Sequence, residues 1–154
     1  AAFRASERPL DDLANVVLCG PSSLTRAERE LIAAALSHGN ECDFCFNSHA
    51  AVARHLAGDR AADVDRAIAD PAAADEKMAA LLAIAEKVRR DGRLVTAADV
   101  ARARAAGADD RAVHDTVLIA AMFCMFNRYV DGLGTVAPAD PAAYTEIGVR
   151  IAAK

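Results

Sequence analysis

The chain has 154 residues, 54% of them hydrophobic and 26% charged, which suits one ordinary domain with a sizeable core and excludes wholesale disorder. Lys and Arg number 18 against 22 Asp and Glu, a net charge of −4, so the basic excess of a nucleic-acid-binding surface is absent. About a quarter of the residues are alanine and only 5% are aromatic, a mixture that favours close-packed helices over sheets.

The first clear helix signals stand in the first third of the chain. Thr25 and Glu28 form a capping box, which predicts a helix that runs through the apolar residues 31–36 and ends at residues 39–40. Six consecutive apolar residues leave no polar face there, so we expect this helix to be buried on all sides. A second helix is predicted over residues 41–56.

Five further helices are predicted downstream from similar signals. Asp70-Pro71 and Asp140-Pro141 each place a capping acid before a proline at the first helical position, and Thr96 with Asp99 forms a second capping box. The predicted ranges are 59–69, 71–91, 96–107, 109–132 and 140–154. Because no strand pattern is credible, the sequence predicts an all-α protein of seven or eight helices that forms one domain over residues 1–154.

No segment has the pattern of an address or a membrane anchor. Residues 1–9 lack the apolar region of a signal peptide, although the first residue is not a methionine and what precedes Ala1 stays open. The longest apolar run, residues 117–126, is about half of the ~20 residues that a membrane span needs. Four cysteines are too few for a secreted disulfide scaffold, so a cytoplasmic location without membrane contact is expected.

The segment from Cys42 to His49 carries the strongest chemical signal. On a helix, Cys42 and Cys45 lie one turn apart on the same face, and His49 lies one turn beyond Cys45. The start of a helix favours a thiolate, and His49 can take or hold the Cys45 proton. Two thiols this close can form a disulfide, so a sulfenic acid on one would be resolved by the other. The alternative is a pair of buried, unreactive cysteines.

Glu30 is the second element of this candidate site. It is predicted on the preceding buried helix, with Ala33, Ala34 and Ser37 as neighbours on the same face. A carboxylate among small apolar residues is costly unless it has a partner, which makes Glu30 a candidate proton relay for the thiols. The alternative, an exposed Glu30 beside neighbouring arginines, is equally open at this point.

These residues resemble a known family. The order Glu30, Cys42-x-x-Cys45, His49 is similar to the signature of the alkylhydroperoxidase AhpD-like group within the carboxymuconolactone decarboxylase superfamily. Residues 24–50 fit that group throughout, and two later stretches are similar to its peroxidase-related branch, residues 95–115 and 124–134. The resemblance is strongest over residues 10–135, so the whole chain, residues 1–154, is interpreted as one domain of this type.

The resemblance implies an all-α homo-oligomer, a trimer or hexamer, with an antioxidant dithiol that reduces hydroperoxides. In that scheme Cys45 is the peroxidatic thiol, Cys42 is the resolving thiol, and Glu30 with His49 forms the proton relay. It implies no cofactor and no metal ion. The reductant would be an unidentified dithiol, with lipoyl and thioredoxin-like proteins as the candidates.

The chain differs from AhpD proper between the two cysteines, where Asp43 and Phe44 stand and AhpD proper has a His.

Two other classes of function stay open. The same four site residues are ligand types that suit zinc, although three of them share one helix, whereas structural zinc sites usually draw on two loops. A decarboxylase-like or isomerase-like member without redox chemistry is the third interpretation, against which the Cys-x-x-Cys pair argues.

The remaining candidates have simpler predicted roles. Cys19 and Cys124 stand in apolar surroundings and are expected to pack in the core. His38 is expected to be exposed in the turn before the thiol helix, or else to line the site. His55 and His114 are expected on the surface. The polar residues that close the longest helix either line a pocket near the thiols or form an ion pair at the helix end: Asn127, Arg128, Tyr129 and Asp131.

Overall fold

The computed structural model describes residues 4–153, which form eight α-helices and contain no strand. In chain order the helices are α1 (Arg4–Cys19), α2 (Arg26–Gly39), α3 (Asp43–Ala57), α4 (Ala61–Ala69), α5 (Glu76–Arg90), α6 (Ala97–Ala105), α7 (Asp110–Gly132) and α8 (Pro141–Ala152). Single 3-10 turns stand at Gly58–Arg60, Pro71–Ala73 and Gly92–Leu94. The prediction of an all-α, single-domain fold is confirmed. In the described part of the chain, no helix has the length and apolar character that crossing a membrane requires.

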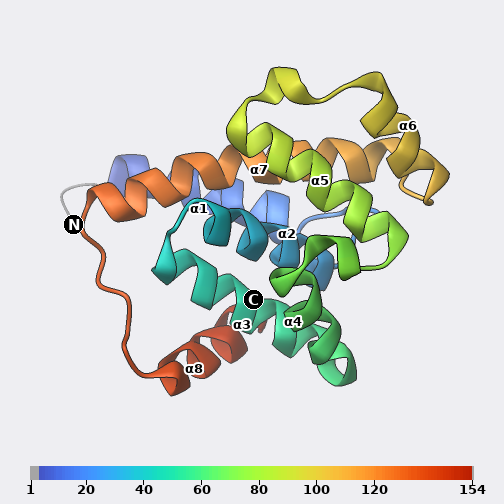
Figure 1. Ribbon diagram of the computed structural model, residues 1–154. Helices are drawn as coiled ribbons and strands as arrows, with labels where there is room; N and C mark the ends of the chain where they lie inside the picture. The colour runs from blue at the N-terminus through green and yellow to red at the C-terminus, as the bar shows by residue number, and fades with distance from the viewer. Residues whose placement is uncertain (1–3, 154) are drawn as a thin grey trace.

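Helix α2 is the innermost helix, packed against α3, α5 and α7 (Figure 1). Its capping box forms as predicted, with the Glu28 amide donating to Thr25 Oγ1 at 3.2 Å and the Thr25 amide donating to the Glu28 carboxylate at 2.7 Å. The apolar run 31–36 is buried, apart from the half-buried Ala35. Full burial of each Leu or Ile side chain contributes about 1.5–3 kcal/mol, which explains why this helix lies in the centre.

The C-terminal helix α8 packs along α3 after an extended linker, residues 133–140, which runs down the left side of Figure 1. The two helices approach closely at Gly148, where an added Cβ would lie 2.9 Å from the carbonyl carbon of Ala51. At the end of α8, the Arg26 guanidinium donates to the carbonyl oxygens of Ile151 at 3.4 Å and Ala152 at 3.0 Å. Helix α8 therefore shields one face of α3 from solvent.

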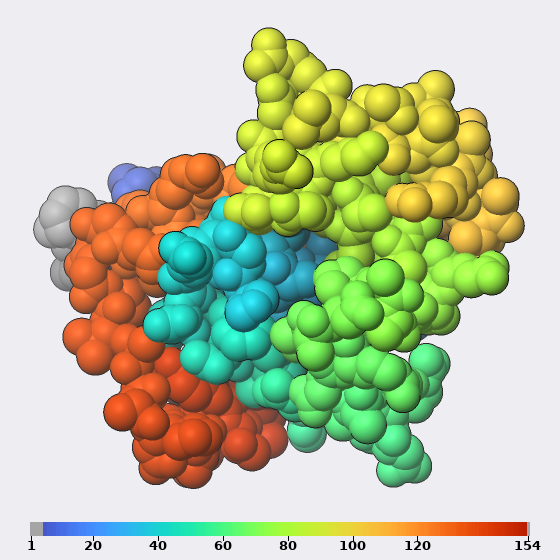
Figure 2. Space-filling model, in the orientation of Figure 1, coloured from blue at the N-terminus to red at the C-terminus, as the bar shows by residue number. Residues whose placement is uncertain are grey.

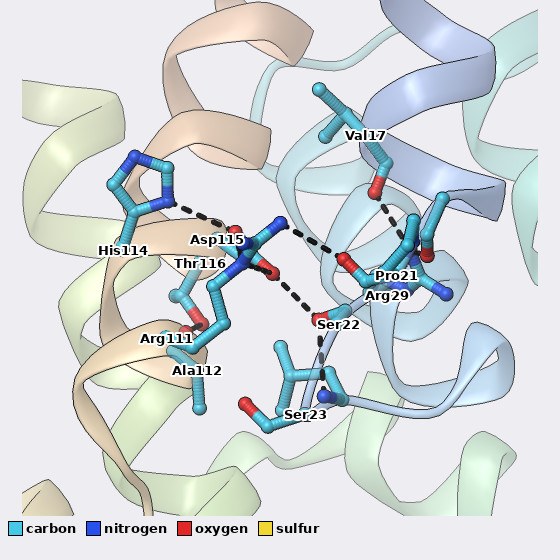
Figure 3. Close-up of polar contacts among 12 residues, drawn as sticks. Val17, Pro21, Ser22, Ser23, Arg29, Arg111, Ala112, His114, Asp115 and Thr116 are labelled. Carbon is cyan, nitrogen blue, oxygen red and sulfur yellow. Dashed lines mark hydrogen bonds and ion pairs between the residues drawn. The ribbon is translucent and has the colours of Figure 1, made fainter.

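A buried polar cluster fixes the segment between α1 and α2 to α7 (Figure 3). Asp115, which is 5% exposed, accepts hydrogen bonds from Ser22 Oγ at 2.6 Å, Arg111 Nε at 2.9 Å and His114 Nδ1 at 2.9 Å. Burial by itself would raise the pKa of Asp115, but these hydrogen bonds outweigh it and lower the pKa below its usual range. We call these four residues, together with Arg29, the tether.

Arg29 is the buried cation of the tether and is 4% exposed. Its guanidinium donates to the carbonyl oxygens of Val17 at 3.0 Å and Gly20 at 2.9 Å, which closes the end of α1 (Figure 3). Burial lowers the pKa of Arg29 from its ordinary value. The tether thus joins three chain segments that are distant in sequence: the end of α1, the start of α2 and the first half of α7.

The structure differs from the predicted elements in two places. Helix α1 is absent from the seven predicted ranges, because it contains Pro9 and its described side chains are mostly exposed, with only Val17 and Leu18 buried. The predicted helix over 71–91 was wrong at its start. A second capping acid, Asp75, accepts from the Met78 amide at 2.9 Å, so α5 begins later and the first capping acid opens only a 3-10 turn. The other ranges agree closely, although the predicted end at Lys154 lies outside the described residues.

Candidate active site

The turn between α2 and α3 sets the position of the two thiols. Glu41 has a positive φ of 59°, the left-handed conformation that non-glycine residues rarely adopt. Cys42 follows as the N-cap residue of α3, and its amide donates to the Ser37 carbonyl oxygen at 3.0 Å. From α5, Arg89 donates to the Gly39 carbonyl oxygen at 2.8 Å and supports the turn. The turn therefore folds Cys42 back against the end of α2.

Cys42 and Cys45 are free thiols, and both are buried, with exposed fractions of 0% and 5%. Burial raises the pKa of the Cys42 thiol, and the neighbouring Asp131 carboxylate adds to the rise, which brings the pKa to about 12. Burial also raises the pKa of Cys45, but the Cys42 thiol and the Asn127 amide lie close enough to oppose that rise by hydrogen bonding. Of the two residues, Cys45 has the surroundings that better stabilise a thiolate.

A carboxylate–imidazole pair accompanies the thiols. Glu30 on α2 is 0% exposed, and its Oε2 lies 2.6 Å from Nδ1 of His49 on α3, so the alternative of an exposed Glu30 is wrong. This contact assigns the Nδ1 proton to the shared hydrogen bond and leaves Nε2 free to accept a proton. The His49 ring packs edge-on against Phe123, with ring centroids 4.7 Å apart, and its side chain keeps 18% exposure.

Helix α7 contributes polar groups that the sequence only suggested. Asn127, which is 1% exposed, donates its Nδ2 to Ser37 Oγ at 3.0 Å and accepts from Asn40 Nδ2 at 2.8 Å. One turn further along, Asp131 is exposed and lies beside the Cys42 thiol. The sequence left two alternatives for the polar residues at the end of this helix, a position near the thiols or an ion pair at the helix end. Asn127 and Asp131 lie near the thiols. Their position after a long apolar run on α7 was the available signal.

The four predicted site residues lie on α2, on α3 and in the turn between them, as two adjacent units. Glu30 is bonded to His49, and Cys42 contacts Cys45. Within residues 4–153, no hydrogen bond joins the His49 ring to either sulfur. The same part of the chain holds no group of three or more His, Cys, Asp or Glu side chains arranged to bind a metal ion.

The two remaining cysteines differ from each other. Cys19 is half-buried and packs against the core, in line with the prediction. The core prediction for Cys124 was wrong. Its half-buried sulfur accepts from Asn40 Nδ2 at 3.9 Å and donates to the Arg89 carbonyl oxygen at 4.0 Å, because the polar α2–α3 turn meets α7 at this point. Arg128 donates to the Cys124 carbonyl oxygen at 2.7 Å, back along its own helix.

The three histidines outside the relay are exposed, as predicted for His55 and His114 and as one alternative for His38. The His38 ring rests against Phe46 on α3, with ring centroids 4.8 Å apart. His114 donates to Asp115 in the tether and has no contact with the thiols among the described residues.

The first part of α3 comes to the surface in the middle of Figure 2, with the end of α7 in orange on one side and α4 in green on the other. Two surface hollows lie elsewhere: one of about 480 Å³ between α4 and the starts of α2 and α5, and one of about 910 Å³ along α5 and α6. Neither hollow is lined by Glu30, Cys42, Cys45 or His49. The two hollows are therefore separate from the candidate site.

Comparison with known proteins identifies the family of the chain. Residues 6–87, more than half of the chain, match the carboxymuconolactone decarboxylase family, and the match contains Glu30, both thiols of the pair and His49. No curated protein matches the sequence. An uncharacterized peroxidase-related protein from Silicibacter sp. TM1040 is 27% identical, with a TM-score of 0.81, over 94% of this chain and 75% of that chain.

A second solved structure gives the same picture. The alkylhydroperoxidase AhpD core of an uncharacterized peroxidase-related protein from Ralstonia eutropha JMP134 is 27% identical to this chain. Its TM-score is 0.83, over 96% of this chain and 77% of that chain. The family match and the shared fold together confirm the resemblance on which the motif was interpreted. The chain belongs to the carboxymuconolactone decarboxylase family and has an AhpD-like fold.

Proposed function

We propose that the protein is a thiol-dependent peroxidase, an oxidoreductase that reduces hydroperoxides through Cys42 and Cys45. The observation that carries the proposal is the reduced, buried dithiol at the start of α3, followed one turn later by His49 with its Nδ1 2.6 Å from the fully buried Glu30. Peroxide reduction of this kind needs a nucleophilic sulfur, a second thiol and a base, and these residues supply all three.

The first step consumes the peroxide. Nε2 of His49 takes the Cys45 proton, and the thiolate attacks the terminal oxygen of the hydroperoxide. The S–O bond forms, the O–O bond breaks, and the alkoxide leaves and takes the proton back from His49. The Glu30 carboxylate orients the imidazole and stabilises its charged form through the 2.6 Å contact.

The second step restores a stable sulfur. The Cys42 sulfur attacks the Cys45 sulfenic acid, so that an S–S bond forms and water leaves. The dithiol thus loses the two electrons that the peroxide gains. A dithiol reductant then reduces the disulfide by thiol–disulfide exchange. The proposal names this reductant by its class alone, a lipoyl or thioredoxin-like dithiol protein.

Cys45 is assigned as the attacking thiol for three reasons. It lies one helical turn from His49, whereas Cys42 lies two turns away. Asn127 and the Cys42 thiol favour its thiolate, while the raised pKa of Cys42, about 12, keeps that sulfur protonated. Cys45 is also the more exposed of the two, at 5% against 0%.

The test is thiol counting with peptide mapping. One equivalent of hydrogen peroxide or tert-butyl hydroperoxide should remove two thiols and leave a Cys42–Cys45 disulfide, with Cys19 and Cys124 still reduced. Cys45→Ser should abolish peroxide consumption. Cys42→Ser should still turn over once and leave a trappable sulfenic acid on Cys45. Cys19→Ser is the control and should behave as the wild type.

Three outcomes would count against the proposal. Thiols that stay intact under peroxide would refute peroxidase activity. Zinc released on thiol modification, at about one ion per chain, would support the zinc alternative instead. A sulfenic acid on Cys42 in Cys45→Ser, with none on Cys45 in Cys42→Ser, would reverse the roles of the two thiols.

We also propose that the protein forms a homo-oligomer through the outer face of α7. Three large apolar side chains, Leu118, Met125 and Tyr129, are exposed there at helical spacing, and the exposed Leu133 follows at the end of the helix. A continuous apolar stripe is characteristic of an interface. Light scattering should give a multiple of the chain mass that Met125→Glu reduces, whereas a wild-type monomer at micromolar concentration would refute the proposal.

A further inference from the structure

The resolving thiol has no route for its proton within the relay described above. Cys42 is 0% exposed, so water does not reach its sulfur directly. A thiol that forms a disulfide must release its proton, and a buried thiol needs a protein group to accept it. His49 lies two helical turns from Cys42, and its Nδ1 is engaged with Glu30 at 2.6 Å. A different acceptor is needed beside Cys42.

Asp131 places a carboxylate where that acceptor is needed. Asn127 fixes the register of α7 against the α2–α3 turn, with Nδ2 3.0 Å from Ser37 Oγ and Oδ1 2.8 Å from Asn40 Nδ2. Asp131 follows one turn later on the same face of α7, and this register places it beside the Cys42 thiol. Because Asp131 is itself exposed, it connects a thiol that water does not reach with solvent.

We propose that Asp131 is a catalytic residue of the resolving step and accepts the Cys42 proton as Cys42 attacks the oxidised Cys45. This inference rests on the proposed function. In the step, the S–S bond forms, the S–O bond of the Cys45 sulfenic acid breaks, and the hydroxide that leaves takes a proton from solvent to become water. The Cys42 proton passes to Asp131 and from there to solvent, so that the carboxylate is regenerated.

The same carboxylate also keeps the resting Cys42 thiol protonated. Burial and the negative charge of Asp131 hold the pKa of Cys42 at about 12 before oxidation, so Cys42 does not compete for the peroxide. Once the Cys42 sulfur begins to bond to Cys45, its S–H group becomes strongly acidic, and its proton passes to the neighbouring Asp131 carboxylate. One residue thereby sets the order in which the two thiols react.

The test separates the two steps in single-turnover experiments with hydrogen peroxide. Asp131→Asn retains the shape of the side chain and removes its basicity. Sulfenic acid should form at the wild-type rate or faster, because the Asp131 charge disfavours the Cys45 thiolate. Disulfide closure should slow on the order of 10²-fold, so that sulfenic acid becomes trappable while both thiols are present. Asp131→Glu should recover most of the closure rate.

A second readout does not depend on peroxide. An aromatic disulfide reagent, used in a Cys19→Ser, Cys124→Ser background, releases one chromophore when Cys45 attacks it. It releases a second chromophore when Cys42 closes the disulfide. Slow second release in Asp131→Asn supports the role of Asp131 even if the wild type reduces no peroxide, an outcome that would refute only the proposed function. The inference would be overturned if the second chromophore were released at the same rate with Asp131→Asn and without it in this background.

Asp43 provides a matched control because it is an exposed carboxylate on the first turn of α3, next to Cys42 in the sequence. Asp43→Asn makes the same change of charge near the thiols, yet it should leave disulfide closure at the wild-type rate. Closure slowed equally by Asp43→Asn and Asp131→Asn would show a general charge effect and overturn the assignment. Equal slowing of sulfenic acid formation and closure in Asp131→Asn would also overturn it.

Discussion

Two polar clusters connect α7 to the segments before and after α2, and they differ in how fully their buried carboxylates are bonded. In the tether, near the start of α7, Asp115 accepts from three side chains (Figure 3). In the thiol site Glu30, which follows Arg29 directly on α2, accepts only from His49, and its second oxygen, Oε1, is buried without a partner in the described residues. Each cluster contains a buried carboxylate, but both oxygens accept hydrogen bonds only in Asp115.

The difference separates a structural carboxylate from one that can take part in proton transfer. Every donor on Asp115 favours its charged form, so the group holds one state and one geometry. Glu30 has a single partner, and that partner is an imidazole, a group that can both accept and donate a proton. An incompletely bonded buried oxygen costs folding free energy, and such costs are typical of functional sites. The comparison therefore predicts opposite effects on turnover and on stability when each carboxylate is removed.

The largest effect is expected for Glu30→Gln. The amide retains the shape of the side chain and can still bond to His49, but it no longer stabilises the imidazolium. Peroxide turnover should fall about 10²–10⁴-fold. The free energy of unfolding should change by less than about 1 kcal/mol, because a buried charge is removed with the bond retained. Initial rates and urea unfolding on the same preparation check both. Lost stability with unchanged turnover would make Glu30 structural.

Asp115→Ala should give the reverse pattern. It leaves Ser22 and Arg111 without the buried carboxylate that they share, and lost hydrogen bonds to a buried group are destabilising. We expect a loss of about 1–3 kcal/mol, or ~2–12 °C in melting temperature. Sulfenic acid formation should be unchanged in the remaining folded protein. Calorimetry and single-turnover kinetics measure the two effects, and slower sulfenic acid formation at full folding would contradict the division.

The sequence predicted most of the fold because its helices carry strong local signals. The capping boxes at Thr25 and Thr96 and the fully apolar run of α2 each specify their element without tertiary information. Helix α1 lacked such a signal, since it is held by the tether and a few apolar contacts near its end. Asp75 overrode the proline-containing start signal at residues 70–71, and two competing caps cannot be ranked from one sequence.

The site was predicted only in part, because its helix-local residues and its long-range residues give different signals. The spacing of Cys42, Cys45 and His49 on one helix was visible in the sequence. Asn127 and Asp131 reach the thiols through the packing of α7 against the α2–α3 turn, so the sequence could offer this position only as one of two alternatives. The tether was missed entirely for the same reason, since Ser22 and Asp115 are far apart in the chain.

The free energy of unfolding should depend on pH in opposite directions for the two clusters. Because burial and Asp131 raise the pKa of Cys42 to about 12, the stability that its thiol contributes is fully present below the unfolded pKa of ~8.5. That stability is lost as pH rises toward 12, at no more than about 1.4 kcal/mol per pH unit. Asp115 acts in the opposite direction: its lowered pKa contributes stability above ~3.9 that is lost as pH falls.

Urea unfolding at several pH values measures this contrast. Cys42→Ala should flatten the alkaline limb of the stability profile above pH ~8.5 and leave the acid limb as it is. Asp115→Asn should flatten the acid limb below pH ~4 and leave the alkaline limb as it is. Parallel profiles for the wild type and both variants would show that these groups do not carry the pH dependence.

The smallest expected effect concerns the turns that lead into the two clusters. Glu41, in the turn that leads to the thiol site, has a φ of 59°. Within residues 4–153 no other non-glycine residue has a positive φ, so the segment that leads to the tether carries no such strain. The left-handed conformation costs a non-glycine residue about 1–2 kcal/mol, and glycine gives back part of that gain through its greater entropy when unfolded. Glu41→Gly should therefore stabilise the protein by about 0.5–1 kcal/mol, measured as a shift of the urea midpoint at constant slope.

Glu41→Ala is the matched control, because it removes the carboxylate and retains the steric cost of the left-handed conformation. It should leave the midpoint near that of the wild type, and a gain equal to that of Glu41→Gly would assign the effect to charge. If the strain also orients Cys42, Glu41→Gly should slow disulfide closure while leaving sulfenic acid formation unchanged. A stabilised variant with unchanged closure would show that the turn holds the thiols in place without help from the strained backbone, and that α7 alone positions the resolving step.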